Sequence, residues 1–156
     1  MTTPDMNHDI ARIGVSAPDW ILQSVLAALN EGQISNAVDQ FDDHFTFTDH
    51  ALDLAFTRKE RLVKFFQTTR ELFPGTVVEV DFSFQCGDHV VAEWKLTATQ
   101  AVNYYGSTAL RVPISVRGAS IVRCENGRIT HWSDYYDPTR SRRFSVAALF
   151  AEGIEY

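Results

Sequence analysis

The chain has 156 residues, of which 45% are hydrophobic and 22% are charged, and these ordinary globular values exclude a disordered or fibrous protein. This length suits one domain with a core of its own. A net charge of -6 and a pI near 5.3 argue against nucleic-acid binding, which needs a basic stripe. No apolar run is long enough to cross a membrane, and the polar N-terminus is unlike a signal peptide, so a cytoplasmic protein without membrane contact is expected.

The two cysteines have neither metal-ligand spacing nor the setting of a catalytic thiol. Cys86 and Cys124 lie on β-type segments, where we expect buried thiols in a reducing compartment. The histidines and the Asp42-Asp43 pair lack ligand spacing as well, and no glycine-rich phosphate loop is present. The sequence therefore predicts no bound metal and no cofactor.

The first half of the chain is mainly helical in pattern. Residues 1–17 are polar without a clear period and are expected to form an N-terminal arm. Pro18-Asp19 then opens a helix with an apolar stripe, which ends at the Asn30-Glu31-Gly32 stop signal. A short second helix is expected around Ile34–Phe41, and a third over Arg58–Phe73.

The second half is β-rich. Between the second and third helices, His44–Thr48 alternates like a strand, and Ala51–Phe56 is its candidate hairpin partner. Four longer strands follow, at Thr76–Cys86, Val90–Tyr104, Arg111–Cys124 and Arg128–Asp137. The pattern predicts one α+β domain over residues 18–140, with helices on one face of an antiparallel sheet. Residues 141–156 are expected to cover a pocket mouth or to contact a partner subunit.

The last expected strand follows the strong hairpin signal Asn126-Gly127 and carries an acid between aromatic residues. Side chains of a strand alternate between its two faces, so Trp132, Asp134 and Tyr136 share one face and His131 lies on the other. A carboxyl group between two aromatic side chains is costly to bury unless it is paired or used. This face therefore indicates the floor of a small-molecule pocket.

Three stretches resemble a known superfamily: residues 26–32 (LAALNEG), 42–47 (DDHFTF) and 132–137 (WSDYYD). With the order of elements, they resemble the nuclear-transport-factor-2-like superfamily, and residues 112–137 are similar to SnoaL-like polyketide cyclases and limonene-type epoxide hydrolases. The resemblance covers most of the chain, from residue 18 to residue 140. It implies a cone in which a strongly curved antiparallel sheet wraps the helices and encloses an apolar pocket. It also implies a homodimer.

The resemblance also implies which residues to examine. Epoxide hydrolases of this type use the first Asp of the closing motif, which is Asp134 here. They also need an Arg and a second Asp on the strand that corresponds to Val90–Tyr104. Trp94 and Leu96 occupy those two positions, so the group that orients the acid and the acid that protonates the epoxide are both missing. Epoxide hydrolysis by that mechanism is disfavoured.

Ketosteroid isomerases are another branch of the same superfamily. They place a general base at the end of the first strand, where Asp49 lies. Their oxyanion hole needs a Tyr and a protonated Asp, and the matching positions hold Val25 and Ser120. Without those donors an enolate lacks its electrostatic stabilisation, so this isomerase mechanism is disfavoured too. SnoaL-like cyclases use a single acid with few other polar groups, and Asp134 or Asp49 can serve.

Asp134 is thus the first catalytic candidate and Asp49 the second. In a dry pocket, desolvation would raise the pKa of Asp134 and let it exchange a proton near neutral pH. The structural alternative is a salt bridge from Asp134 to Arg117 or Arg123, and for Asp49 it is a turn or cap where the strand ends. The expected ligand-binding side chains are Phe47, Trp94, Leu96, Ser120, Trp132 and Tyr136.

Two functions from different classes follow. The first is a SnoaL-like protein that binds a small, largely apolar organic molecule and catalyses proton transfer of the cyclase or isomerase type. The second is a non-catalytic ligand-binding or dimerisation module of the same fold, in which the acids only orient a ligand or balance charge. A carboxyl of Asp134 in an enclosed cavity without a basic partner favours the first function.

Overall fold

A computed structural model of the protein describes residues 17–104 and 107–138. Its elements are α1 (Ala17–Asn30), α2 (Ile34–Val38), β1 (Phe41–Asp49), β2 (Leu54–Phe56), α3 (Lys59–Leu72), β3 (Val77–Cys86), β4 (His89–Tyr104), β5 (Ser107–Glu125) and β6 (Arg128–Tyr136). The expected arm up to residue 16 and the expected closing segment at 141–156 lie outside the described residues. None of the described helices is both long and apolar enough to span a membrane.

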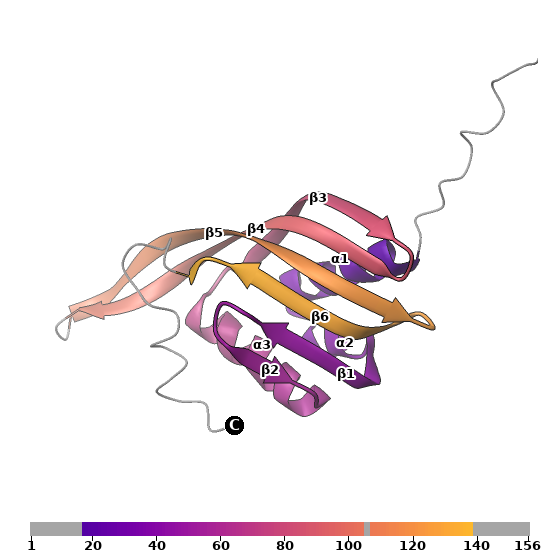
Figure 1. Cartoon of the computed structure of the whole chain (residues 1–156). Helices are drawn as coiled ribbons and strands as arrows, with labels where there is room; N and C mark the ends of the chain where they lie inside the picture. Colours follow the sequence, from indigo (N-terminus) through magenta and orange to yellow (C-terminus); the bar gives the residue numbers. More distant parts are fainter. Residues whose placement is uncertain (1–16, 105–106, 139–156) are drawn as a thin grey trace, which may run out of the picture.

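The strands form one curled sheet in the order β2-β1-β6-β5-β4-β3, and it stays open between its two edges. All neighbouring strands are antiparallel except β1 and β6, which run parallel. Figure 1 shows the helices gathered on the concave side, where α1 contacts β3, β4 and β5 and α3 contacts β1 and β2. The expected α+β cone is confirmed, and the parallel β1–β6 pair is the one departure from an antiparallel sheet.

Several element boundaries differ from the sequence prediction, and strand pairing explains two of the differences. The second helix ends at Val38 instead of Phe41, and Phe41 begins β1. Phe41 pairs with Ile129 of β6, and both side chains are fully buried. The apolar spacing of this segment fits a helix, but burial against β6 outweighs the local preference. At the other end of the sheet, β5 begins at Ser107, before the expected Arg111, because it pairs with nearly the whole length of β4.

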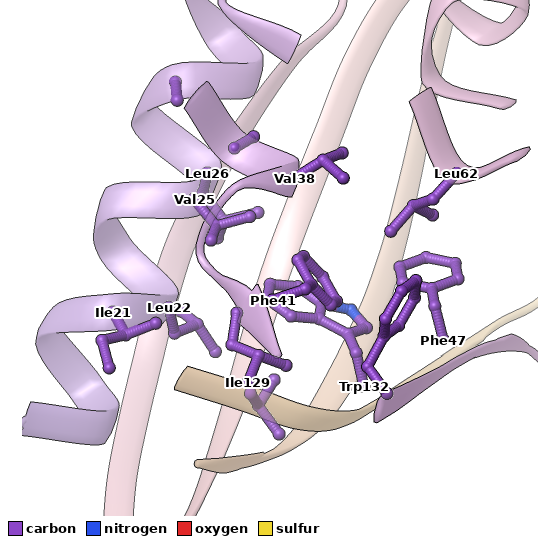
Figure 2. Packing of buried hydrophobic residues seen from close by; sticks show 14 of the residues in the cluster. Ile21, Leu22, Val25, Leu26, Val38, Phe41, Phe47, Leu62, Ile129 and Trp132 are labelled. Carbon is purple, nitrogen blue, oxygen red and sulfur yellow. The ribbon is translucent and has the colours of Figure 1, made fainter. Parts of the chain in front are cut away.

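Aromatic side chains of β1 and β6 fill the centre of the core. The Trp132 indole stacks on Phe47 with ring centres 6.3 Å apart, and it also lies 6.0 Å from the Phe41 ring. Figure 2 shows these rings between Leu62 of α3 and the apolar side chains of α1. The inner face of β6 is therefore fixed by packing at Trp132, and the next inward side chain along the strand is Asp134.

The cysteines have different environments. Cys124 is buried, as expected, and burial raises the pKa of its thiol to about 11, which leaves it protonated and unreactive at neutral pH. Cys86 is exposed, so the expectation that it is buried is wrong. It is the last residue of β3, an edge strand, and the next residue already belongs to the turn. The sequence pattern does not reveal that this strand has a neighbour on one side only.

The last residue of α1 ties that helix to the edge strand β3. The side-chain amide of Asn30 donates to the carbonyl of Val78 at 2.9 Å, and its oxygen accepts from the Val78 N–H at 2.8 Å. Arg70 of α3 donates to the Leu29 carbonyl at 2.7 Å and so satisfies an end of α1 as well. These contacts hold the C-terminal end of α1 against the sheet.

Replacing Asn30 by Ala is expected to lower the free energy of unfolding by about 2 kcal/mol, because both peptide groups of Val78 lose their partner. Urea unfolding followed by circular dichroism measures the change. The matched control is Asn36→Ala, since Asn36 is an exposed amide that bonds only to a neighbouring glutamine side chain. Equal effects of the two substitutions would contradict the role of the Asn30 clamp.

Candidate functional site

A cavity of about 170 Å³ lies between the concave face of the sheet and helices α1 and α3. Its wall is mainly apolar and rich in aromatic rings. All eight side chains that the sequence proposed as site residues contribute to this wall: Phe47, Asp49, Trp94, Leu96, Ser120, Trp132, Asp134 and Tyr136. The structure thus brings residues from four strands to one space.

Strand pairing places the two acids and Ser120 side by side. In the parallel β1–β6 pair, Asp49 is the register partner of Asp134. In the antiparallel β5–β6 pair, Ser120 is the partner of Asp134 on its other side. Partners across a ladder project to the same face of the sheet, so the three side chains form one row at the cavity wall.

Two hydrogen bonds hold the Asp134 carboxyl through the same oxygen. The Ser120 hydroxyl donates to Oδ1 at 2.5 Å, and the Trp132 indole N–H donates to Oδ1 at 2.6 Å. The Trp94 indole N–H in turn donates to the Ser120 oxygen at 2.8 Å. Oδ2 has no partner among the described residues. No fully inaccessible side-chain oxygen in that part of the chain lacks a hydrogen bond, so Oδ2 keeps accessible surface.

The environment of Asp134 raises its pKa from 3.8 to about 7. The largest cause is desolvation, because the carboxyl lies deep in the domain although the residue as a whole is half-buried and faces the cavity. The bonds from Ser120 and Trp132 act in the opposite direction, and the charge of Asp49 raises the pKa further. The carboxyl can therefore take up and release a proton near neutral pH.

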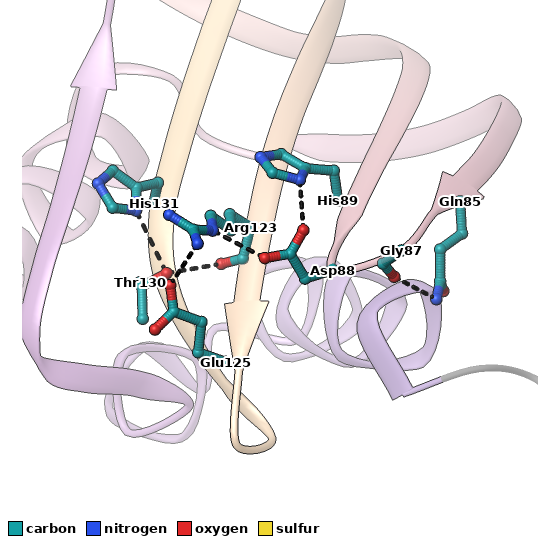
Figure 3. A network of polar contacts seen from close by, with 8 residues as sticks. All are labelled: Gln85, Gly87, Asp88, His89, Arg123, Glu125, Thr130 and His131. Carbon is teal, nitrogen blue, oxygen red and sulfur yellow. Dashed lines mark hydrogen bonds and ion pairs between the residues drawn. The ribbon is translucent and has the colours of Figure 1, made fainter.

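The basic residues considered as partners of Asp134 pair elsewhere. Arg117 forms an ion pair with Asp81 at 2.7 Å. Arg123 pairs with Asp88 at 2.8 Å and with Glu125 at 3.0 Å. Figure 3 shows this second group, in which a hydrogen bond also links His89 to Asp88.

Both arginines occupy positions on β5 that alternate with the inward-facing Ser120. The structural alternative of a salt bridge from Arg117 or Arg123 to Asp134 is therefore not what the structure contains. No Lys or Arg ion pair to Asp134 occurs within residues 17–104 and 107–138.

Asp49 is buried more completely than Asp134, with 3% of its surface exposed, but both of its oxygens are occupied. The Tyr136 hydroxyl donates to Oδ2 at 2.8 Å, and the backbone N–H of Leu52 donates to Oδ1 at 2.9 Å. Desolvation raises the pKa of Asp49, and these hydrogen bonds counteract it. Burial and the neighbouring Asp49 raise the pKa of the Tyr136 phenol, which therefore remains a donor. The expected turn at the end of the strand is thus present at Oδ1 of Asp49, which accepts from Leu52, whereas Oδ2 accepts from Tyr136 in the pocket.

Most other polar groups of the wall already have protein partners. Asn30 is bonded to Val78, and the hydroxyls of Thr69 and Thr76 donate to the Phe65 and Phe73 carbonyls. Both indole N–H groups and the Ser120 hydroxyl are used around Asp134. Among the described lining side chains, this leaves Oδ2 of Asp134 and the Nε and Nη2 groups of Arg70 without a hydrogen bond.

Strand register separates the sheet positions nearest to these two groups. Arg70 is held at the Asn30 end of α1, which is clamped to Val78, and Val78 pairs with Leu96 of β4. Ser120, beside Asp134, pairs with Ala92 of the same strand. The two β4 positions differ by four residues (96 − 92), which corresponds to roughly 13 Å along a strand. A ligand beside Asp134 therefore meets one polar atom at that end and apolar surface around it.

Sequence reasoning missed Asn30, Arg70 and the glycine at position 118, all of which shape the wall or its neighbours. The sequence pattern predicts Asn30 as part of a helix stop, and nothing in that pattern shows that it clamps β3. Arg70 lies on the third helix, and its contact with α1 is long-range.

Within the described residues, no three His, Cys, Asp or Glu side chains gather as a metal site would require.

Replacing Asp134 by Asn is expected to stabilise the protein at pH 8, by about 2 kcal/mol, because a buried charge is removed. The amide oxygen still accepts from Ser120 and Trp132. Since folding raises the pKa of Asp134 to about 7, the folded state binds more protons, and wild-type stability falls as pH rises from about 4 to 7. Below about pH 4 the Asp134 carboxyl is neutral in both the folded and the unfolded state, so it no longer destabilises the fold.

Urea unfolding at pH 5 and pH 8 checks this expectation. The difference in unfolding free energy between Asp134→Asn and wild type should grow from pH 5 to pH 8. Glu79→Gln, at an exposed position of β3, is the matched control and should show no such trend. A loss of stability in Asp134→Asn that is the same at both pH values would contradict the buried, titrating carboxyl.

Solved structures share this fold at low sequence identity. A protein with a ketosteroid isomerase-like fold from Catenulispora acidiphila, in complex with trimethylamine, is 23% identical, with a TM-score of 0.67 over 82% of this chain and 89% of that one. A candidate SnoaL-like polyketide cyclase from Shewanella putrefaciens is 12% identical, with a TM-score of 0.71 over 85% and 98%. IdmH, a candidate polyketide cyclase from Streptomyces antibioticus, is 17% identical, with a TM-score of 0.68 over 77% and 91%.

At these identities the structural likeness establishes the fold alone. No curated protein sequence matches the chain. The family profile described as the SnoaL-like domain matches residues 22–132, which run from within α1 to the middle of β6 and include all the site residues up to Trp132. The chain, which has the fold of nuclear-transport-factor-2-like proteins, is therefore a member of the SnoaL-like domain family.

Proposed function

We propose that this SnoaL-like protein binds a small, largely apolar organic molecule in the cavity and exchanges a proton with it through Asp134. The supporting observation is a carboxyl group with a pKa near 7 that lines an apolar wall and has no basic partner among the described residues. General acid–base groups work best when their pKa lies near the working pH. Oδ2 is the reacting oxygen, because Oδ1 already accepts two hydrogen bonds.

The size of the cavity favours a compact ligand. An engineered protein cavity of about 150 Å³ holds one benzene molecule, and the cavity here measures about 170 Å³. A single substituted ring or a short chain fits such a volume, and a fused system of four rings does not. The aromatic faces of Trp94 and Tyr136, whose centres lie 6.0 Å apart, would contact a flat ring.

The shortage of hydrogen-bond donors near Asp134 limits the chemistry. Removal of a proton beside a carbonyl leaves an enolate, whose oxygen needs donors in a dry site. The donors around Asp134 are used within the protein, and Arg70 lies at the other end of the wall. The substrate class is therefore a molecule whose C–H is already acidic, such as one flanked by two carbonyl groups. Asp134 takes that proton and returns it to another atom of the same molecule.

Asp49 has a supporting role in this scheme. Its two oxygens are occupied by Tyr136 and by the backbone of Leu52, so it is poorly placed to exchange a proton itself. Its negative charge makes Asp134 a stronger base. Trp94 and Leu96 stand where epoxide hydrolases of this type need an Arg and a second Asp, so epoxide hydrolysis by that mechanism stays disfavoured.

Exchange of hydrogen for deuterium at carbon tests the catalytic proposal. In deuterated buffer, ¹H NMR of a monocyclic β-keto ester should show faster loss of the proton between its carbonyls in the presence of the protein. Asp134→Asn should reduce the catalysed rate by about 100-fold or more, because the proton acceptor is lost. Glu79→Gln should leave it unchanged. Full exchange activity in Asp134→Asn would exclude Asp134 as the base.

Ligand binding is measured separately, because the non-catalytic alternative predicts binding without exchange. Trp94 and Trp132 line the cavity, and Trp20, with 59% of its surface exposed, adds background fluorescence. In a Trp20→Phe background, ligand entry should change the emission of the two cavity indoles. Binding without any exchange in the wild-type protein would favour the ligand-binding module over the enzyme.

The proposed homodimer has a candidate surface on the outer face of the sheet. Phe82, Phe84, Ile121 and Tyr135 are exposed there, and strand register places them on one side: Phe84 and Ile121 both pair with Val91. The rings of Phe82 and Phe84 lie 6.1 Å apart. Exposed apolar side chains grouped in this way are typical of a contact surface, and a second copy of the chain is the proposed partner.

Light scattering after size-exclusion chromatography tests this expectation. The wild-type protein should have twice the mass of the chain, and the double substitution Phe82→Ser, Phe84→Ser should yield a monomer, because its apolar contact surface is lost. Trp20→Ser, at an exposed apolar residue of α1 away from the outer face of the sheet, is the control and should leave the mass unchanged. A monomeric wild-type protein would contradict the dimer.

A further inference from the structure

Gly118 of β5 lies between two aromatic residues that line the cavity. Its register partner on β4 is Trp94, and its partner on β6 is Tyr136. All three positions face the cavity side of the sheet, as Ser120 does two residues further along β5. Gly118 thus contributes no side chain to a row in which both neighbours are large.

The Trp94 indole fills the space that a side chain at position 118 would take. A Cβ at Gly118 would lie 2.5 Å from Cζ2 of Trp94, closer still to Cη2, and 2.8 Å from the Tyr135 carbonyl oxygen. Contacts this short do not occur in proteins without a shift of one partner. The Gly118 φ angle lies outside the left-handed region, so space is the reason for a glycine here, and backbone conformation is not.

The position of the Trp94 ring decides where its N–H points. With the benzo ring over Gly118, the indole N–H reaches the Ser120 oxygen at 2.8 Å, and the Ser120 hydroxyl is then directed at Oδ1 of Asp134 at 2.5 Å. The same gap lets Trp94 approach Tyr136 to 6.0 Å between ring centres, and Tyr136 holds Asp49. The absence of a side chain at Gly118 therefore lets Trp94 and Tyr136 take these positions. Trp94 reaches Asp134 through Ser120, and Tyr136 bonds directly to Asp49.

We propose that Gly118 is a positioning residue, which seats the Trp94 indole so that the Trp94–Ser120–Asp134 relay occupies Oδ1 and leaves Oδ2 as the oxygen that exchanges a proton with the ligand. This inference rests on the proposed role of Asp134. A glycine that served only close strand packing would affect folding but would leave the proton affinity of Asp134 unchanged. The two readings therefore differ in a measurable property of another residue.

The test follows the Asp134 carboxyl directly by ¹³C NMR in protein labelled at aspartate, titrated from pH 5 to pH 9, with Asp134→Asn used to assign its signal. Ser120→Ala removes a hydrogen bond to the charged form and should increase the proton affinity of Asp134 by about tenfold. Trp94→Phe keeps an aromatic ring but loses the N–H, and should act in the same direction by a smaller factor of about three.

Gly118→Ala should match Trp94→Phe, because the displaced indole can no longer reach Ser120. Combined with Trp94→Phe, it should add no further change in the proton affinity, since the relay is already broken. A folded Gly118→Ala protein whose Asp134 titrates as in wild type would overturn the proposal, and so would a second, additive change in the double variant.

Three features keep the result decisive. If Gly118→Ala does not fold, the Trp94→Phe protein still tests the relay, and an unchanged Asp134 titration in that variant would refute it. The double variant offers a second route to a folded protein, because the indole atoms that the new methyl group meets are gone and only its contact with the Tyr135 carbonyl oxygen stays. The NMR readout also needs no turnover, so a wild-type protein without deuterium exchange would reject the proposed enzyme and leave the Gly118 inference to be judged on its own.

Discussion

The burial of a carboxyl group without a counter-charge is the constraint on which the site depends. Moving an ionised Asp into an apolar wall is costly unless hydrogen bonds or a cation compensate. At Asp134 the compensation comes from two donors on one oxygen, and no guanidinium or ammonium pairs with it among the described residues. This balance is incomplete, which is why the group keeps a proton up to about pH 7. A fully compensated carboxylate would stay ionised and would make a weaker base.

The fold produces this balance through strand pairing more than through any single residue. The parallel β1–β6 pair brings Asp49, near the beginning of the chain, beside Asp134, near its end. The β5–β6 pair adds Ser120, and β4 supplies the indole behind it. The packing of Trp132 against Phe41 and Phe47 fixes β6 just before its acid. The Trp132 side chain therefore belongs both to the core and to the site.

Alternation along β6 was enough to predict that Trp132, Asp134 and Tyr136 face one way, because a strand has a strict period of two. The α+β cone followed from the order of elements and the family resemblance. The parallel pairing of β1 could not be predicted, since it depends on which strands meet after the chain has folded. For the same reason, the local sequence pattern could not predict the ion pairs of Arg117 and Arg123 or the exposure of Cys86. Gly118 carries no signal of its own, because its role exists only in relation to the Trp94 ring.

The arrangement of polar groups bears on the choice between an enzyme and a binding module. A module that only held an apolar ligand would be more stable with an apolar residue at position 134, because burying a carboxyl there opposes folding at neutral pH. The wall instead satisfies most of its polar groups internally and leaves one carboxyl oxygen accessible beside Trp94 and Tyr136. Apart from the free nitrogens of Arg70, Oδ2 of Asp134 is the one unoccupied polar atom of the described wall, and a single group that gives and takes a proton suits proton transfer.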